Sequence, residues 1–273
     1  MILSTGSAAW GGSAPLGVAL LALLAYLSVA LPPVARAGAW SAPALIAGWV
    51  LHLVLLLLDI GGWGQGQPGA RLGFAPVLSM TVWLVIAVHG LESRLVPLPG
   101  VRRVLAAVGA AAVALAWMFP GEARVLSSPW APLHFVLGIA SYGLFGAAVL
   151  HALLLDGAER RLRMRRVDPA GGAMGMPLLL LERMTFRFVE AGFVVLSATL
   201  LLGVLTTTQW VWDHKTVFSL LGWTVFAALL GGRRLHGWRG RRATRWLYAG
   251  AALLLLAYVG SRFVIEVLLE RAS

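Results

Sequence analysis

Residues 209–216 read Gln209-Trp210-Val211-Trp212-Asp213-His214-Lys215-Thr216, a polar and tryptophan-rich segment between two long apolar runs. The run before it extends from Val189 to Thr207, and the run after it extends from Thr216 to Gly231. Roughly 20 mostly apolar residues form a helix that crosses the hydrocarbon core of a bilayer. The octapeptide is therefore predicted to connect two membrane-spanning helices at one surface of the membrane.

The same alternation of apolar runs and short polar connections continues through all 273 residues, of which 59% are hydrophobic, and the mean hydropathy is +0.84. Because these Leu-, Ala- and Val-rich runs lack strict alternation, the fold class is predicted to be an all-α polytopic transmembrane helix bundle. About eight spans use up nearly the whole chain, which predicts a single transmembrane domain over residues 1–273. The predicted spans are Pro15 to Ala35, Pro43 to Ile60, Gly73 to Leu91, Val101 to Phe119, Ala131 to Leu155, Val189 to Thr207, Thr216 to Gly231 and Thr244 to Leu268.

The charge distribution predicts the orientation of the bundle. The net charge of +11 comes from arginines that border the spans, without a nucleic-acid-binding module, so nucleic acid is not an expected partner. The positive-inside rule assigns arginine-rich connections to the cytoplasm. Both termini and residues 209–216 are then expected on the periplasmic side of a bacterial inner membrane. The arginines that decide this orientation are Arg36, Arg94, Arg102, Arg103, Arg160, Arg161, Arg163, Arg165, Arg166, Arg183, Arg187, Arg233, Arg234, Arg239, Arg241, Arg242 and Arg245.

The longest expected cytoplasmic connection covers residues 156–188. Its first part is a basic run from Glu159 to Arg166, which indicates contact with the headgroups of the lipid bilayer. Its last part, Pro177 to Phe188, mixes leucines with charged residues, and this pattern favours a helix that lies on the membrane before the sixth span begins.

Histidine is the expected ligand for any metal or heme iron, because the chain has six histidines and no cysteine. The absence of cysteine also excludes disulfides and a Cys-x-x-Cys-His heme attachment within this chain. His52 and His151 fall at membrane depth, where an ionisable group is a functional hypothesis by default. A buried histidine that is hydrogen-bonded to a backbone carbonyl explains them equally well. For His89, a structural hydrogen bond near Glu92 is the favoured interpretation.

His134 stands at the outer start of the fifth predicted span, on the expected face of residues 209–216. Heme needs an axial imidazole for its iron, apolar walls for the macrocycle and cations for its propionates. The alternative interpretation assigns these tryptophans and histidines to the aromatic belt that lines any membrane interface. The residues that would form the heme site are His134, His214, Trp210, Trp212, Asp213 and Trp223, with Arg124 and Lys215 as weaker candidates for the propionates.

Several segments resemble the cytochrome c assembly family of heme-handling membrane proteins, the CcsA, CcmC and HemX group. The resemblance rests on Trp210-x-Trp212-Asp213-x-Lys215-Thr216 followed by Trp223, and on His134-Phe135-Val136 running through Ala140-Ser141-Tyr142. Three further segments are similar to the YpjD-type branch of bacterial inner-membrane proteins. They are Leu181-Glu182-Arg183, Gly237-Trp238-Arg239-Gly240-Arg241-Arg242 and Ala257-Tyr258-Val259-Gly260-Ser261-Arg262.

The resemblance implies an eight-helix bundle whose periplasmic segment contacts heme, expected to be heme b, for presentation or transfer. Trp210, Trp212 and Asp213 match the tryptophan-rich signature of the family, and His134 matches its periplasmic histidine. The implied partners are other membrane proteins of cytochrome maturation or heme homeostasis. The chain departs from the better-known synthases at Gln209 and Val211, and at Ser261-Arg262-Phe263, where they carry a second periplasmic histidine. His214 is our own candidate for that missing ligand.

No nucleophile with a positioned base is visible, so the chain is not expected to be an enzyme by itself. One alternative is a membrane scaffold or accessory subunit that keeps the fold without stoichiometric heme binding. The other is a transporter for heme or another small molecule, for which broken helices and an inverted repeat are the expected signs.

Overall fold

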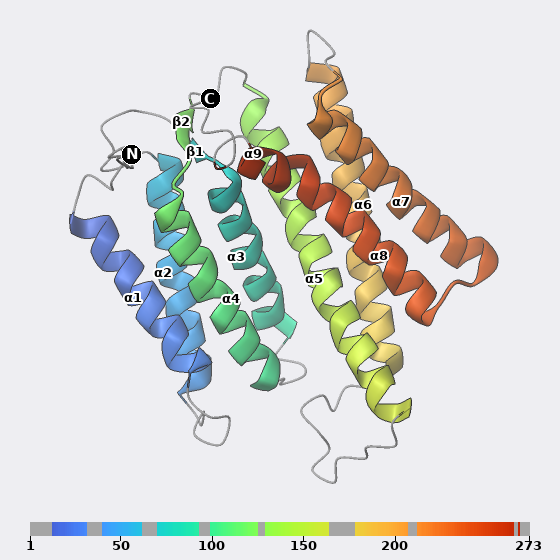
Figure 1. Cartoon of the computed structure of the whole chain (residues 1–273), viewed down its shortest axis with the longest axis horizontal. Helices are drawn as coiled ribbons and strands as arrows, with labels where there is room; N and C mark the ends of the chain where they lie inside the picture. The colour runs from blue at the N-terminus through green and yellow to red at the C-terminus, as the bar shows by residue number, and fades with distance from the viewer. Residues whose placement is uncertain are drawn as a thin grey trace, which may run out of the picture.

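The computed structural model describes residues 13–31, 40–61, 70–92, 99–124, 129–163, 178–206 and 212–264, together with residue 267. Within these residues the chain forms a bundle of antiparallel helices (Figure 1), so the predicted all-α fold class is confirmed. The long helices are α1 (Ser13–Ala30), α2 (Ser41–Gly61), α3 (Phe74–Glu92), α4 (Pro99–Met118), α5 (Ala131–Arg163), α6 (Leu178–Thr206), α7 (His214–His236) and α8 (Gly240–Leu255). The chain then continues through a π-helical turn, η2 (Leu256–Gly260), into α9 (Ser261–Phe263).

The helices have the length and composition expected of membrane spans. Seven of those in the described residues, α2 to α7 and the continuous segment Gly240–Phe263, are long and apolar enough to cross a membrane. The apolar part of α1, Pro15–Ala30, is shorter. Many large hydrophobic side chains on these helices are exposed, as expected where lipid rather than water covers the surface.

The helices fall into two groups that lie side by side, α1 to α4 and α5 to α8 (Figure 1). The core of the first group surrounds Tyr26, whose ring fits against Gly48 and Gly109. The core of the second group surrounds Phe226, which stacks on Phe145 with ring centroids 3.9 Å apart. Helix α3 packs against α5 and joins the two groups.

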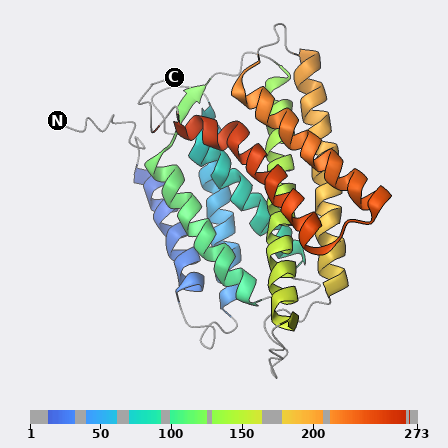
Figure 2. The ribbon, with the colours of Figure 1, turned by 45° about the vertical axis from the view of Figure 1, so that its right-hand side comes forward.

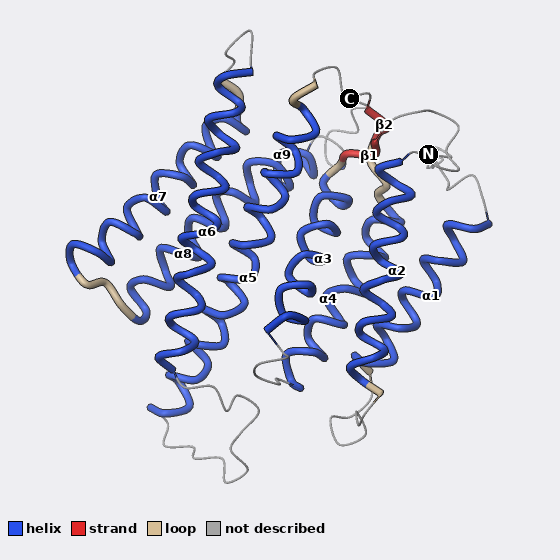
Figure 3. The backbone as a smooth tube through the Cα atoms, turned by 180° about the vertical axis from the view of Figure 1, so that it is seen from behind, coloured by secondary structure: helices blue, strands red, loops and turns tan. Residues whose placement is uncertain are grey.

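Two short strands, which the sequence did not predict, tie the first group together at one end. Strand β1 (Ala70–Leu72) pairs antiparallel with β2 (Glu122–Arg124), with Ala70 opposite Arg124 (Figure 3). Gly121 precedes β2 with a φ of 71°, and a Cβ on it would lie 2.9 Å from the backbone nitrogen of Gly73. Only glycine combines this left-handed conformation with so close an approach. We call the end of the bundle that holds the strands and the start of α7 the strand end, and the opposite end the arginine end.

Helix α8 runs obliquely across α5, as Figure 2 shows, and thereby carries η2 to α3 at the strand end. There Val259 of η2 packs with Phe74, Ala75 and Val77 of α3. This contact forms a second junction between the two helix groups, beside the junction of α3 with α5. We call this apolar cluster the seam.

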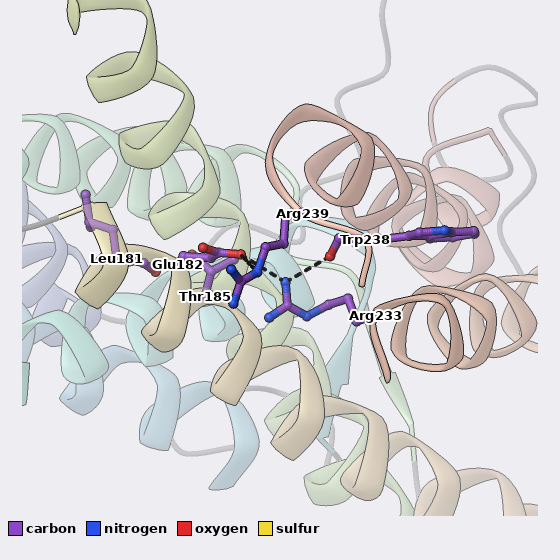
Figure 4. A network of polar contacts seen from close by, with 6 residues as sticks. All are labelled: Leu181, Glu182, Thr185, Arg233, Trp238 and Arg239. Atoms are coloured by element: carbon purple, nitrogen blue, oxygen red, sulfur yellow. Dashed lines mark hydrogen bonds and ion pairs between the residues drawn. The ribbon is translucent and has the colours of Figure 1, made fainter. Parts of the chain in front are cut away.

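At the arginine end, an ionic network fixes the turn between α7 and α8 against α6 (Figure 4). The Glu182 carboxylate lies 3.3 Å from Nη1 of Arg233 and 3.6 Å from Nε of Arg239. The Arg233 guanidinium also lies 3.3 Å from the centre of the Phe186 ring, and it donates to the backbone carbonyl of Trp238. Polar groups of the first turns of α6 are therefore satisfied by α7 and the α7–α8 turn.

This network explains why the helices extend further into residues 156–188 than expected. Helix α5 continues to Arg163, and α6 begins at Leu178 and runs without a break into the membrane. The prediction of a separate surface helix over Pro177 to Phe188 is therefore wrong: residues 178–188 form the first turns of α6, and Pro177 lies outside the described residues. Asp156 is held in the same way, because it accepts hydrogen bonds from Thr244 and Tyr248 of α8.

Candidate functional site

The start of α7 presents the last residues of the tryptophan-rich segment. Asp213 is the N-cap of α7, and its Oδ1 accepts a hydrogen bond of 2.8 Å from the backbone N–H of Thr216. The cap ends the preceding connection and fixes where the helix begins. Trp212 is 70% exposed just outside the helix, and His214 is exposed on its first turn. Trp210 lies outside the described residues.

The cap makes a pH-dependent contribution to stability. Partial burial raises the pKa of Asp213, whereas hydrogen bonds from the backbone and side chain of Thr216 lower it. The charges of Lys215 and His214 lower the pKa further, and it ends below the ordinary value of 3.8. A carboxyl group whose pKa is lowered on folding stabilises the folded state above its unfolded pKa. That stabilisation is lost as the pH falls through the lowered value.

We expect Asp213→Ala to lower the free energy of unfolding by about 1 kcal/mol at neutral pH, the usual cost of losing an N-cap. Denaturation of the detergent-solubilised protein at several pH values measures this difference, which should shrink as the pH falls below 3.8. Asp213→Asn is the matched control, because an amide caps the helix without titrating. Equal loss from both variants would contradict the capping role.

Lys215 connects the start of α7 to the seam. Its ammonium group lies 5.8 Å from the centre of the Tyr258 ring in η2, within the range of a cation–π contact. Tyr258 in turn packs against the seam. The neighbouring hydroxyl of Tyr142 on α5 donates to the carbonyl of Leu254, directly before the π-helical turn. A π-helical turn disrupts the regular helical bonding pattern, and such turns occur frequently at functional sites.

His134 lies at the same end of the bundle but faces a different helix. It is exposed on the first turn of α5, and its ring lies against Gly203 of α6, where an added Cβ would be 3.2 Å from Cε1. The next residue, Phe135, packs against the seam instead. Because Gly203 lies near the end of α6 and His214 begins α7, both imidazoles are at the strand end. Within the described residues, no hydrogen bond or ring contact joins His134 to His214.

Two further candidates occupy supporting positions. Trp223 lies deeper on α7, where its indole N–H donates to Oγ of Ser197 at 2.8 Å and its ring stacks on Phe193. It thereby holds α7 against α6. Arg124 lies in β2 at the strand end, and its side chain is outside the described part of the structure.

His52 is bonded at both ring nitrogens within the first helix group. Nδ1 lies 3.2 Å from the hydroxyl of Tyr26, and Nε2 lies 2.7 Å from Oγ of Ser79. The side chain is only 1% exposed. A buried histidine with two partners of this kind crosslinks α1, α2 and α3, which favours the structural interpretation over that of an iron ligand.

His151 shares a proton with Glu92 between α5 and α3. Nδ1 of His151 lies 2.8 Å from the carbonyl oxygen of Ala147, so this nitrogen must carry a hydrogen and donate it. Nε2 lies 3.1 Å from Oε2 of Glu92, and a hydrogen bond there requires one proton between the two atoms. The expected bond near Glu92 thus goes to His151 rather than to His89. His89 is 3% exposed, and its Nε2 has no hydrogen-bond partner among the described residues.

Comparison with known sequences identifies the family to which the chain belongs. The sequence model of the cytochrome C assembly protein family matches residues 37–269, which is most of the chain. The chain belongs to the cytochrome c assembly family. The predicted resemblance is therefore confirmed, and membership supports a role in handling heme.

Among its relatives, this cytochrome c assembly protein is 31% identical to the inner membrane protein YpjD of Escherichia coli K12, over 90% of this chain and 97% of the relative. It is 31% identical to an uncharacterized 28.8 kDa protein of Azospirillum brasilense, over 92% of this chain and 97% of that protein. It is 22% identical to the cytochrome c biogenesis protein CcsA of Prochlorococcus marinus, over 68% and 70% of the two chains. No solved structure matches. The relatives and the membrane-length helices confirm a multi-pass protein of the bacterial inner membrane.

Sequence reasoning did not find two contacts that shape this cytochrome c assembly protein. One joins Lys215 to Tyr258, and the other joins Glu92 to His151. Each links residues on different helices. Tyr258 carried a weak signal, because it belongs to one of the segments that are similar to the YpjD-type branch.

Proposed function

We propose that the protein binds heme at the strand end and presents or transfers it on the periplasmic side of the membrane. The observation that carries this proposal is the placement of His134 at the start of α5 and of Trp212 to Lys215 at the start of α7. Both groups are at one end of the bundle and largely open to the surroundings. The arginine-rich α7–α8 turn lies at the opposite end, which supports a periplasmic strand end.

The side chains present fit a heme group. His134 and His214 each offer an exposed imidazole, the usual protein ligand of heme iron. Trp212 offers a large exposed apolar surface for the macrocycle, and Trp210 would add a second indole. Lys215 and Arg124 would neutralise the propionates. Heme b is the proposed form, because the chain has no cysteine to attach heme covalently.

The proposed partners are heme and other membrane proteins of cytochrome maturation or heme homeostasis. Asp213 and Trp223 act in this proposal by holding α7, since one caps the helix and the other bonds it to α6. His52 and His151 are assigned to packing instead, because both nitrogens of each ring already have partners.

Absorption spectra of the detergent-purified protein from heme-replete cells test the proposal directly. We expect a Soret band in the parent protein and at least about tenfold lower heme content in His134→Ala or His214→Ala. Even residues that only orient metal ligands change metal affinity by this factor or more. His236→Ala is the matched control, because His236 is equally exposed but lies at the arginine end.

Two results would overturn the proposal. One is the absence of a Soret band in folded parent protein, even after heme is added back, which would favour a scaffold or accessory subunit. The other is an equal loss of heme in His236→Ala, which would place the heme elsewhere or show unspecific binding.

A further inference from the structure

A groove between α2 and α3 at the arginine end opens toward the lipid phase. Its volume is about 500 Å³, and its walls are mostly apolar. Ile46 on α2 and Leu91 on α3 are 61% and 69% exposed at its edge. The lining residues include Leu45, Ile46, Ile86, Ala87, Gly90 and Arg102.

The groove has a fixed floor. Trp49 of α2 lines it and stacks on Trp83 of α3 with ring centroids 4.8 Å apart and an interplanar angle of 10°. Each indole N–H donates to the backbone carbonyl of the other tryptophan at 3.1 Å. Two reciprocal hydrogen bonds and one stacked pair hold α2 and α3 at a constant separation. The tryptophan pair therefore fixes the spacing of α2 and α3 along the groove.

One positive charge lies in the wall of this otherwise apolar groove. Arg102 is half-buried in the first turn of α4, and that turn contains no acidic residue. The carboxylate of Glu92, at the nearby end of α3, is engaged by His151. The neighbouring Arg103 differs, because its Nε donates to the carbonyl of Ala30 at 2.7 Å. Among the described residues, no ion pair neutralises Arg102, and the positive end of the α4 dipole adds to its charge.

We propose that this groove binds an anionic glycerophospholipid, with an acyl chain along α2 and α3 and the phosphate at Arg102. The apolar walls match the chain, and the charge sits at the end of the bundle where the headgroups of the arginine-rich face lie. Basic pockets between transmembrane helices on the cytoplasmic side are known to select anionic headgroups. A zwitterionic lipid would fit the walls equally well but would gain less from Arg102.

Lipid retention by the purified full-length protein tests this site. Detergent-solubilised protein without added heme is incubated with equal amounts of phosphatidylglycerol and phosphatidylcholine, repurified, and analysed for bound lipid by mass spectrometry. We expect the parent to retain phosphatidylglycerol about fivefold over phosphatidylcholine, the preference that one arginine near a membrane surface provides. Arg102→Gln should remove this preference. Arg245→Gln, which changes an exposed arginine of α8 outside the groove, should keep it.

A second variant tests the groove itself. Gly90→Leu adds a side chain to the lining of the groove at a position where a Cβ would meet nothing within 4 Å. It should lower the retention of both lipids while the protein stays folded. Equal retention of the two lipids by the parent, equal effects of Arg102→Gln and Arg245→Gln, or unchanged retention in Gly90→Leu would each overturn the proposal. Because the bound phospholipid is measured and none of the variants changes a residue of the proposed heme site, the result is distinguishable from a failure of heme binding.

Discussion

Replacing Gly250 by valine is expected to lower the free energy of unfolding by about 3 kcal/mol, the upper range for overpacking a close-packed interior. A Cβ on Gly250 of α8 would lie 2.8 Å from Cζ of Phe226 on α7. Phe226 cannot move aside, because it is fully buried and stacked on Phe145. Small residues allow this close approach of helices in membranes, where packing replaces the hydrophobic effect.

Denaturation of the purified protein in detergent measures this loss, and Gly231→Ala is the control. Gly231 lies in α7, but a Cβ there would meet nothing within 4 Å. The better helix propensity of alanine should leave that variant unchanged or stabilise it by up to about 1 kcal/mol. A stable Gly250→Val protein would show that α7 and α8 separate more easily than the structure indicates. The variant should also weaken heme binding, because α7 carries Trp212, His214 and Lys215.

Replacing Glu92 by alanine is expected to lower the free energy of unfolding by about 2 kcal/mol, because it leaves a buried polar atom without a partner. His151 is only 2% exposed, and Nε2 would lose the hydrogen bond to Glu92. Nδ1 cannot compensate, since it is committed to the carbonyl of Ala147. The loss falls at the junction of α3 and α5, where the two helix groups meet.

Glu92→Gln tests whether the Glu92–His151 pair needs only one shared proton in a hydrogen bond or the full negative charge of the carboxylate. The amide of glutamine donates a hydrogen to the neutral Nε2 of His151, so the variant should keep most of the stability of the parent. Comparison of the unfolding curves of both variants at neutral pH provides the measurement. A Gln variant as unstable as the Ala variant would contradict a single shared proton, because it would show that the full charge of the carboxylate is required.

The sequence predicted the spans well because the length of an apolar run is a local property. It also predicted that Trp212 and His214 lie outside the hydrocarbon, since polar residues between two spans have no other place to go. It failed where polar residues continue a helix. The sequence read residues 156–163 as a connection and placed residues 178–188 in a separate surface helix, yet the structure joins them to α5 and α6, where Asp156 and Glu182 find partners on other helices.

For the intramembrane histidines, too, the sequence did not reveal the contacts between different helices. The sequence identified His52 and His151 as buried groups that need an explanation but left ligand and structural roles open. The structure supplies Tyr26 and Ser79 for His52, and Glu92 for His151. These partners are distant in sequence, and no periodic pattern links them.

By itself, therefore, the sequence determined the helical class, the number of apolar runs and the exposed positions of Trp212 and His214, because each follows from local hydrophobicity and from the need of every span to bond its own backbone. Only the tertiary structure decided which helices pair, how Lys215 reaches Tyr258, and that Arg102 borders an apolar groove. Those features depend on side chains from different helices that meet in space. In a membrane, shape complementarity and hydrogen bonds decide which helices pack together, because lipid is as apolar as the helices themselves.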